Sequence, residues 1–273
     1  MGKLTGKVAF VTGAARGQGR SHALRLAAEG ADIIAVDVCE QVTSVAYPMS
    51  TPEDLAQTVS QVEALDRRIV SAKADVRDVG AMRAAVEQGV AELGGIDIVL
   101  GNAGIISFEG DDGNDDLAFR DVIDINLTGV WNTVHVTAPL MIEQGRGGAI
   151  VLTSSTQGLT GRGGDGTGAI SGYCAAKHGV VGLMRTFAHW LAPHNIRVNT
   201  VHPTGVNTPM VMNEYVGTVL AARPSFASVL DNLMDVPMVE PIDISNAIAW
   251  LVSDEARFVT GVTLPVDAGF VVK

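Results

Sequence analysis

Residues 8–19 read VAFVTGAARGQG, an apolar run that passes directly into a glycine-rich turn. The run Val8–Thr12 has the length and the β-branched content of a strand that is covered on both faces. Gly13, Gly17 and Gly19 allow a sharp turn and a close approach of the backbone, and Arg20–Glu29 continues with helical periodicity. A strand, a glycine turn and a helix start in this order predict a loop that holds a pyrophosphate at the helix N-terminus.

The same alternation of strand and helix continues along the chain. Short runs rich in Val and Ile, without polar alternation, predict strands that are buried on both faces. They are Val8–Thr12, Asp32–Asp37, Ile69–Lys73, Ile96–Leu100, Ala149–Thr153, Ile196–Val201 and Val262–Val266. Segments with apolar residues three and four apart, such as Val79–Leu93 and Ala175–Leu191, predict helices between them, and Phe119–Ile142 is expected to form a further helical stretch. We therefore expect one α/β domain over residues 1–273, a doubly wound parallel sheet of about seven strands with helices on both faces.

The second predicted strand ends in a carboxylate, Asp37, 18 residues after Gly19. A carboxylate at this place accepts hydrogen bonds from the ribose hydroxyls of an adenosine. It would also lie close to the 2′-phosphate of NADP, a like-charge contact that costs on the order of 1–4 kcal/mol. Arg16 could attract that phosphate, but Val38, Cys39 and Glu40 add no further positive charge. We therefore predict NAD as the cofactor.

The composition excludes several classes of protein. The 273 residues carry 19 basic and 30 acidic side chains, a formal net charge of −11 that would repel nucleic acid and anionic lipid. The longest apolar run, Ala247–Val252, is six residues long, whereas a membrane helix needs about twenty. Cys39 and Cys174 have neither the spacing of a metal site nor a nearby partner. We expect a cytoplasmic protein with no metal site and no nucleic-acid or membrane partner.

A second group of residues could carry acid–base chemistry. Tyr173 and Lys177 are four residues apart, so on a helix they share one face and the ammonium lies near the phenol. A neighbouring cation lowers the pKa of a phenol, which makes Tyr173 a better base near neutral pH. Ser155 follows the predicted strand Ala149–Thr153, where its hydroxyl could bond a substrate oxygen beside the tyrosine. The alternative interpretation is an ordinary helix surface with a solvated lysine.

These residues belong to a longer ordered series of motifs. The glycine turn TGxxxGxG is followed by Asn102-Ala103-Gly104, by Asn126, by SxxG at Ser155, by YxxxK and by a turn over Pro203 to Thr208. In this order and spacing the whole chain resembles the short-chain dehydrogenase/reductase family. The long segment after Asp37 and residues 173–184 are most similar to the carveol dehydrogenase-like, mycofactocin-associated members of that family.

The resemblance implies a catalytic role for four residues. Tyr173 would be the acid/base, and Lys177 would tune the pKa of Tyr173 and bind the nicotinamide ribose. Ser155 would orient the reacting oxygen, and Asn126 would hold a water molecule of a proton relay. Ser154 is the alternative serine, but the spacing within SxxG favours Ser155.

The resemblance also implies which residues bind the dinucleotide. Asp75 and Val76 would hold the adenine, and the three residues from Asn102 would back the adenosine ribose. The expected cofactor-binding residues are Gly13, Ala15, Arg16, Gly17, Gln18, Gly19, Asp37, Val38, Asp75, Val76, Asn102, Ala103, Gly104, Tyr173, Lys177, Pro203, Val206, Thr208 and Met210. The last four would reach the nicotinamide half. The sequence has Pro203-Thr204 where the family commonly has Pro-Gly, with the glycine one residue later.

Three segments are longer than a minimal version of this fold needs, and long irregular stretches of a compact domain are often functional. Residues 38–52 begin at the expected ribose site and are apolar enough to cover the adenosine; the alternative is a surface insertion that packs on the second helix. Residues 160–168 lengthen the spacing between Ser155 and Tyr173 and should bulge over the substrate side. Residues 206–241 correspond to the place where the family has its substrate lid.

The expected lid indicates the kind of substrate. Met210, Met212, Met234 and Met238 lie in this one segment, and flexible thioethers suit an irregular apolar ligand. The alternative is a methionine-rich surface packed against a neighbouring subunit. We therefore expect a hydrophobic alcohol or ketone as the substrate, such as carveol or another cyclic terpenoid.

Together these observations predict an NAD-dependent oxidoreductase that interconverts a hydrophobic secondary alcohol and its ketone by hydride transfer. One alternative is a 3-oxoacyl reductase of fatty-acid type, although its acidic carrier-protein partner suits a chain of charge −11 poorly. The other is a non-catalytic nucleotide-binding or redox-sensing scaffold, which would not need Asn126, Ser155, Tyr173 and Lys177 together. The resemblance further implies a homotetramer, tightly bound NAD and reoxidation by an external electron carrier, mycofactocin.

Overall fold

The computed structural model describes residues 2–107, 115–223 and 231–273. Its seven strands form one parallel sheet in the order β3-β2-β1-β4-β5-β6-β7. They are β1 (Val8–Thr12), β2 (Asp32–Asp37), β3 (Ile69–Lys73), β4 (Ile98–Gly101), β5 (Gly148–Thr153), β6 (Ile196–Pro203) and β7 (Thr263–Val266). The strand order reverses between β1 and β4, so loops at the carboxyl ends of these strands diverge there and leave room for a ligand.

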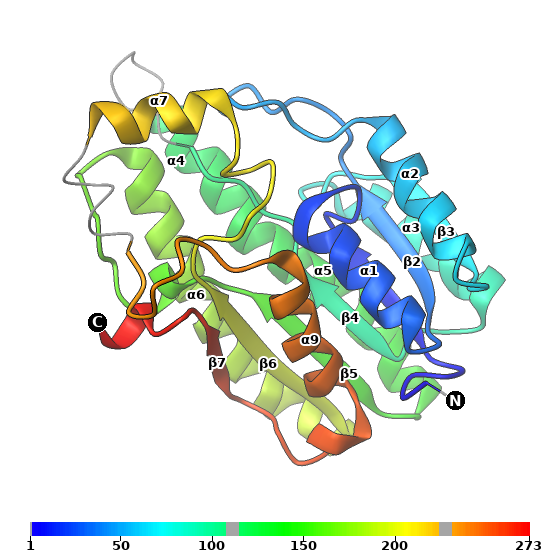
Figure 1. The fold of residues 1–273 in the computed structure, drawn as a ribbon. Helices are drawn as coiled ribbons and strands as arrows, with labels where there is room; N and C mark the ends of the chain where they lie inside the picture. The colour runs from blue at the N-terminus through cyan, green and yellow to red at the C-terminus, as the bar shows by residue number, and fades with distance from the viewer. Residues whose placement is uncertain (1, 108–114, 224–230) are drawn as a thin grey trace.

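Helices cover both faces of the sheet (Figure 1). The helices packed on one face are α1 (Gly17–Ala28), α2 (Pro52–Glu63) and α9 (Pro241–Val252). The helices packed on the other are α3 (Val79–Leu93), α4 (Asp115–Ile123), α5 (Gly129–Gln144) and α6 (Gly168–Leu191). A further helix, α7 (Glu214–Ala222), lies at the carboxyl edge of the sheet, where its Val216 packs in one apolar cluster with Ile170 of α6.

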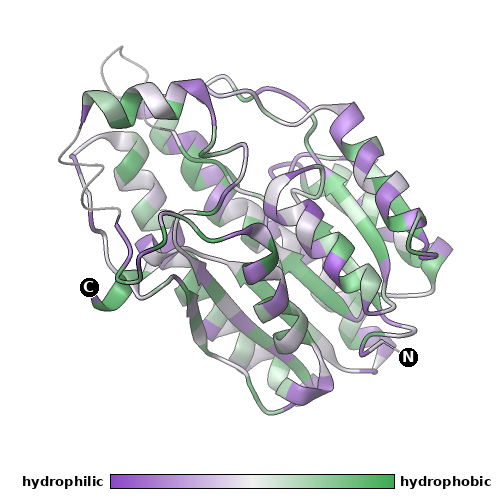
Figure 2. Ribbon diagram, viewed as in Figure 1, coloured by the Kyte–Doolittle hydropathy of each residue, from purple (hydrophilic) through white to green (hydrophobic). Residues whose placement is uncertain are grey.

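The core follows from the alternation of side chains along each buried strand. In β1 the side chain of Phe10 joins the core under α3, α5 and α6, whereas Ala9 and Val11 join the core under α1 and α9. Ile34 and Ile33 divide in the same way in β2. Figure 2 shows the hydrophobic colour along the central strands and polar colour on the outward turns of α1 and α2. The predicted doubly wound α/β fold is confirmed.

Two helix predictions differ from the structure. Residues 119–142 were expected to form one helical stretch, but a π-helical turn, Asp124–Thr128, separates α4 from α5. Apolar periodicity does not reveal such a turn, because it changes the hydrogen-bond pattern by one residue only. The helix expected from Ala175 begins at Gly168, because Thr167 caps it by accepting a hydrogen bond from the Ile170 N–H.

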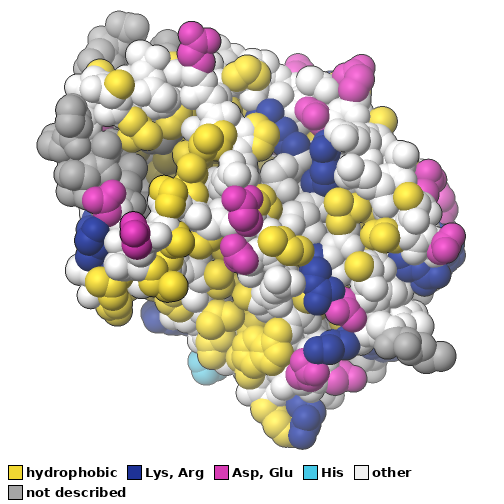
Figure 3. All heavy atoms as spheres, in the orientation of Figure 1, with side chains coloured by type: hydrophobic (Ala, Val, Ile, Leu, Met, Phe, Trp, Pro, Cys, Tyr) yellow, Lys and Arg dark blue, Asp and Glu magenta, His cyan; other side chains and the backbone are white. Residues whose placement is uncertain are grey.

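Within residues 2–107, 115–223 and 231–273, no helix combines the length and apolarity that crossing a bilayer requires. On the face of the molecule in Figure 3, basic side chains lie scattered among acidic ones. Hydrophobic side chains gather on the same face beside and below α7. This apolar region lies over the carboxyl edge of the sheet, where the candidate site is found.

Candidate active site

Two adjoining cavities lie at the carboxyl edge of the sheet. The first is lined by the glycine turn after β1, by the end of β2 and by the residues after β3 and β4. The second continues from it toward the residues after β5 and β6 and has a volume of about 760 Å³. Gln18, Asn102, Gly104, Thr208 and Met210 line both cavities, so the two form one continuous site.

The glycine turn has the shape that a bound pyrophosphate requires. A Cβ atom on Gly19 would collide with the Gly13 carbonyl oxygen, and one on Gly13 would lie 2.9 Å from Ala103 Cα. Helix α1 begins at Gly17 without a side-chain cap and without an acidic residue in its first turn. Its first N–H groups and the positive end of its dipole are therefore available to an anion in the first cavity.

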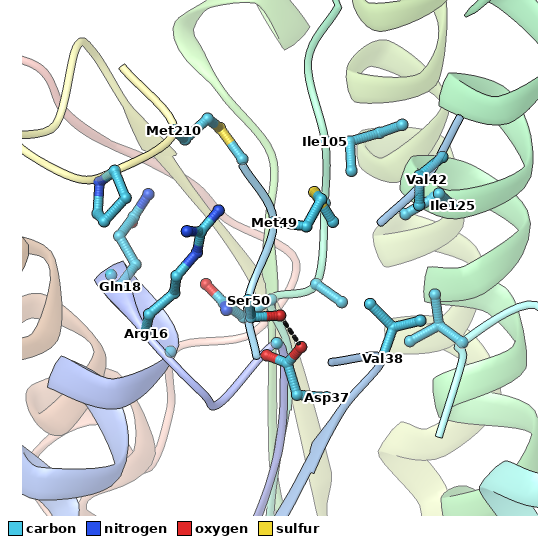
Figure 4. A pocket seen from close by; sticks show the side chains of 18 of the residues that line it. Arg16, Gln18, Asp37, Val38, Val42, Met49, Ser50, Ile105, Ile125 and Met210 are labelled. Atoms are coloured by element: carbon cyan, nitrogen blue, oxygen red, sulfur yellow. Dashed lines mark hydrogen bonds between the residues drawn. The ribbon is translucent and has the colours of Figure 1, made fainter. Parts of the chain in front are cut away.

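Asp37 is fixed at the end of β2 by three hydrogen bonds. One carboxylate oxygen accepts from the Ala15 N–H at 2.9 Å, and the other accepts from the Cys39 N–H at 3.2 Å and from the Ser50 hydroxyl at 2.6 Å. Figure 4 shows the Ser50–Asp37 bond at the wall of the first cavity. Ala15 thus supports the carboxylate from behind, although it does not itself line the cavity.

Residues 38–50 pass beside the same cavity and are bonded to the body of the protein at several points. The Arg16 guanidinium donates to the Pro48 carbonyl oxygen at 2.6 Å, and the hydroxyl of fully buried Tyr47 accepts from the Ile106 N–H at 3.3 Å. Ser44 donates to the Asp121 carboxylate at 2.6 Å. We call these residues the strap.

Part of the strap lines the first cavity. Of the strap residues, the expected cofactor-binding set included Val38 alone. The additional lining residues are Val42, Tyr47, Met49 and Ser50, several of which are labelled in Figure 4. The apolar composition of this segment was the sequence signal for a covering role. Burial raises the pKa of Tyr47 to about 12, so its hydroxyl stays neutral at physiological pH.

The residues after β3 and β4 complete the first cavity. Asp75 and Val76 line it, and the Asp75 carboxylate is paired with the Arg77 guanidinium at 2.7 Å. Asn102 donates from its side chain to the Thr12 carbonyl oxygen at 2.9 Å, which fixes the turn after β4 against the end of β1. Asn102, Ala103 and Gly104 all line the cavity.

Ser155, Tyr173 and Lys177 meet in the second cavity. Ser155 follows β5, and the other two lie one turn apart on α6. Burial raises the pKa of the Tyr173 phenol above its ordinary value, and a hydrogen bond with the Ser155 side chain opposes that rise. A serine hydroxyl that lowers the pKa of a phenol does so by donating to the phenolate oxygen.

Lys177 lies beside Tyr173, one turn later on α6. Its Nζ lies 5.6 Å from the centroid of the Tyr173 ring and donates to the Thr153 carbonyl oxygen at 2.9 Å. Burial lowers the pKa of Lys177 itself to about 8, so the ammonium keeps most of its charge at neutral pH. Lys177 therefore places a positive charge beside the Tyr173 ring.

Asn126 and Gly104 lie beside Lys177. The Asn126 amide accepts from the Ile105 N–H and donates to the Ile105 carbonyl oxygen, both at 2.8 Å, and Asn126 is fully buried in the π-helical turn. A Cβ atom on Gly104 would lie 3.1 Å from Asn126 Oδ1 and 3.6 Å from Lys177 Nζ. Asn126 does not itself line either cavity.

The structure distinguishes the two candidate serines. The Ser154 hydroxyl donates to the Lys177 carbonyl oxygen at 2.8 Å, whereas Ser155 bonds Tyr173. A further residue, His202 on β6, was missed because no motif marks it. Its Nδ1 donates to the Ser155 carbonyl oxygen at 2.8 Å, and burial lowers its pKa to about 4, so the ring is neutral and holds the Ser155 backbone.

The segment after β6 forms one wall of the second cavity. Pro203, Val206, Thr208 and Met210 all line it, and β6 continues through Pro203 without a break. Further apolar lining residues come from the expected lid: Val211, Met212, Val216, Leu220 and Met238. Met234 lies outside the lining and is 62% exposed. Lid residues 224–230 lie outside the described part of the chain.

The described residues contain no group of three His, Cys, Asp or Glu side chains that could hold a metal ion. Cys174 lines the second cavity with its thiol 3.6 Å from Gln157 Oε1, and burial raises the pKa of that thiol. It is therefore neutral at physiological pH and a poor nucleophile.

Comparisons with known proteins agree with this geometry. The family model for short chain dehydrogenases matches residues 7–217. An uncharacterized oxidoreductase of Mycobacterium tuberculosis is 58% identical over 99% of this chain and 98% of its own length. The (−)-trans-carveol dehydrogenase of Rhodococcus erythropolis is 50% identical over the full length of both chains. The crystal structure of carveol dehydrogenase from Mycobacterium avium in complex with NAD superposes with a TM-score of 0.93, at 51% identity and full coverage of both chains.

Proposed function

The chain belongs to the short-chain dehydrogenase/reductase family, and from this membership we propose that it is an NAD-dependent dehydrogenase that interconverts a hydrophobic secondary alcohol and its ketone. The observation that carries the proposal is the meeting of Ser155, Tyr173 and Lys177 in a cavity that adjoins the one lined by the glycine turn and Asp37.

The residues of the first cavity fit NAD. The glycine turn and the uncapped start of α1 suit a pyrophosphate, and the carboxylate of Asp37 suits the hydroxyls of an unphosphorylated ribose. The Arg16 guanidinium could have attracted a 2′-phosphate, but it donates a hydrogen bond to the Pro48 carbonyl oxygen of the strap instead. When bound, NAD supplies the site that accepts or returns a hydride.

The protein's own residues handle the proton and the orientation of the substrate. Ser155 donates a hydrogen bond to the substrate oxygen, and Tyr173 takes the hydroxyl proton during oxidation and returns it during reduction. Lys177 supplies a positive charge beside the phenolate and binds the nicotinamide ribose. Asn126, fixed to Ile105 beside Lys177, holds the water that passes the proton onward.

The second cavity points to an apolar, compact substrate. Eleven Val, Ile, Leu, Met and Phe residues contribute to its walls, and its volume of about 760 Å³ is in the range of small-molecule sites. The relatives named above include carveol dehydrogenases from Rhodococcus erythropolis and Mycobacterium avium. We therefore assign a cyclic alcohol of the size of carveol, a monoterpenoid, to this cavity.

NAD is held tightly under the strap and is reoxidised by an external electron carrier, mycofactocin, instead of exchanging with free NAD. The protein is a homotetramer, as the family resemblance implies, and its subunit contacts cover large exposed apolar side chains of α4, α5 and α6: Leu117, Phe119, Trp131 and Trp190. It works in the cytoplasm, and residues 206–241 act as the substrate lid of the single domain.

The substitution Tyr173→Phe tests the dehydrogenase assignment. It removes only the hydroxyl, so turnover of carveol or cyclohexanol should fall about a hundredfold or more while NAD binding persists. Turnover with free NAD is followed by absorbance of the reduced nicotinamide, and turnover of bound NAD by the reduction of an added dye that accepts its electrons. NAD binding is measured by calorimetry or by NAD content. Full activity of the variant, or no activity of the unmodified protein on any secondary alcohol, would contradict the assignment. Activity lost together with NAD binding would indicate a structural role for Tyr173.

A further inference from the structure

The glycine-rich loop 160–168 places a charged side chain, Arg162, in the wall of the mainly apolar second cavity. The Arg162 guanidinium donates from Nη1 to the Phe270 carbonyl oxygen at 2.8 Å, and its central carbon lies 4.4 Å from the centroid of the Phe270 ring. The planar guanidinium thus meets one residue twice, through a hydrogen bond and through a cation–π contact. Gln157 fixes the start of the loop by donating to the Arg162 carbonyl oxygen at 2.8 Å.

Phe270 belongs to the last turn of the chain, Phe270–Val272, and also lines the cavity. Its side chain is only 2% exposed, whereas that of Val272 is 77% exposed. The turn is attached to the lid as well, because the N–H groups of Leu233 and Met234 donate to the Ala268 carbonyl oxygen at 3.1 and 2.9 Å. One wall of the cavity is therefore assembled from the loop, the lid and the C-terminus, with Arg162 as a link between loop and C-terminus.

We propose that the Arg162–Phe270 pair determines the size of the alcohol that the site accepts, by holding the C-terminal turn against the cavity. The inference rests on the proposed dehydrogenase function and concerns its substrate range. The ring of Phe270 is an apolar boundary whose position depends on the guanidinium stacked on it. Filling or freeing the space of a single methylene group in an apolar pocket changes substrate discrimination by about tenfold or more. Releasing this boundary should therefore admit bulkier alcohols while Ser155, Tyr173 and Lys177 keep their positions.

The substitution Arg162→Met tests the link, because it removes the charge and the planar fork but keeps a long side chain. Phe270→Leu moves the boundary itself and is a second, independent variant. The chain offers a matched control in its other Arg–Phe stack: the Arg257 guanidinium lies 4.9 Å from the ring of Phe258, which is 87% exposed and lines neither cavity. The control variant is Arg257→Met.

The readout is the ratio of kcat/KM for a bicyclic secondary alcohol, 2-decalol, to that for cyclohexanol. We expect Arg162→Met and Phe270→Leu to raise this ratio about tenfold and Arg257→Met to leave it unchanged. Ratios equal to that of the unmodified enzyme in both cavity variants overturn the inference alone. Unmodified protein that oxidises no secondary alcohol overturns the proposed function, and this inference with it.

Discussion

Burial moves the two titrating groups of the catalytic set in opposite directions. It raises the pKa of the Tyr173 phenol above its ordinary value and lowers the pKa of the Lys177 ammonium to about 8. At neutral pH the tyrosine is therefore protonated and the lysine keeps its charge. The hydroxyl of Ser155 is the one described group whose bond to Tyr173 favours the phenolate. The phenol is therefore in the form that donates a proton, whereas the phenolate, which removes one, is favoured by higher pH and by the positive charge of Lys177.

These shifts predict a pH dependence that differs between the two directions of the reaction. Alcohol oxidation needs the phenolate, whose fraction grows tenfold per pH unit below the pKa of Tyr173, so kcat/KM should rise steeply from pH 6 upward. Ketone reduction needs the protonated phenol and should show no such rise. Lys177→Met, which removes the nearby cation, should move the rise to higher pH. Initial rates between pH 6 and 10 measure this, and an oxidation rate independent of pH would contradict it.

Asp37 determines the preference for NAD over NADP, which gives a second prediction. A carboxylate beside a 2′-phosphate costs on the order of 1–4 kcal/mol, so Asp37→Asn should lower the ratio of kcat/KM for NAD over NADP by about tenfold or more. Asp32→Asn, at the opposite end of β2 and paired with Arg68 at 2.6 Å, is the control and should leave the ratio unchanged. Equal use of both cofactors by the unmodified protein would disprove the role given to Asp37.

At the scale of elements, the sequence predicted the role of the strap but not its contacts. Its apolar residues suggested a cover for the adenosine, but Tyr47 and Ser50 reach the cavity through bonds to Ile106 and Asp37, which no local pattern shows. The same is true of the π-helical turn that holds Asn126 against Ile105. Periodicity predicts which face of an element is buried, whereas these contacts depend on which other element arrives there.

The strap leads to a prediction about the release of NAD. If it closes over the bound cofactor, NAD should copurify with the protein and appear in the supernatant after denaturation. Ser44→Ala removes the 2.6 Å bond between the strap and Asp121 on α4, a loss of about 1 kcal/mol that should speed NAD release about fivefold. Ser60→Ala on the exposed face of α2 is the control. Protein that arrives without NAD and turns over freely with added NAD would disprove tight binding.

At the scale of the whole molecule, the parallel fold explains why so much of the site could be predicted. Every strand delivers its carboxyl end to one edge of the sheet, so Asp37, Asn102 and Ser155 meet there although they lie far apart in the sequence. Their motifs are local and therefore visible. His202 under Ser155 and the contact of Arg162 with Phe270, 108 residues away, have no local signature, because they arise only when the chain is packed.

The outer surface of the helices gives the last prediction, the formation of a tetramer. Trp131 on α5 is 41% exposed and stacks on His135 at 4.5 Å between ring centroids, and Phe119 on α4 and Trp190 on α6 are 40% and 44% exposed. Large aromatic side chains are enriched in the buried centres of subunit interfaces. Light scattering at micromolar concentration should therefore give four times the mass of the chain.

A charge at the centre of such an interface would be buried without a partner, so Trp131→Arg should reduce the measured mass. Leu65→Arg is the matched control, since Leu65 is 42% exposed just beyond the end of α2 and lies on the other side of the sheet. This control should remain tetrameric. A monomeric mass for the unmodified protein would refute the tetramer. If Trp131→Arg keeps the tetrameric mass and Leu65→Arg lowers it, the interface lies on the face of α1, α2 and α9 instead.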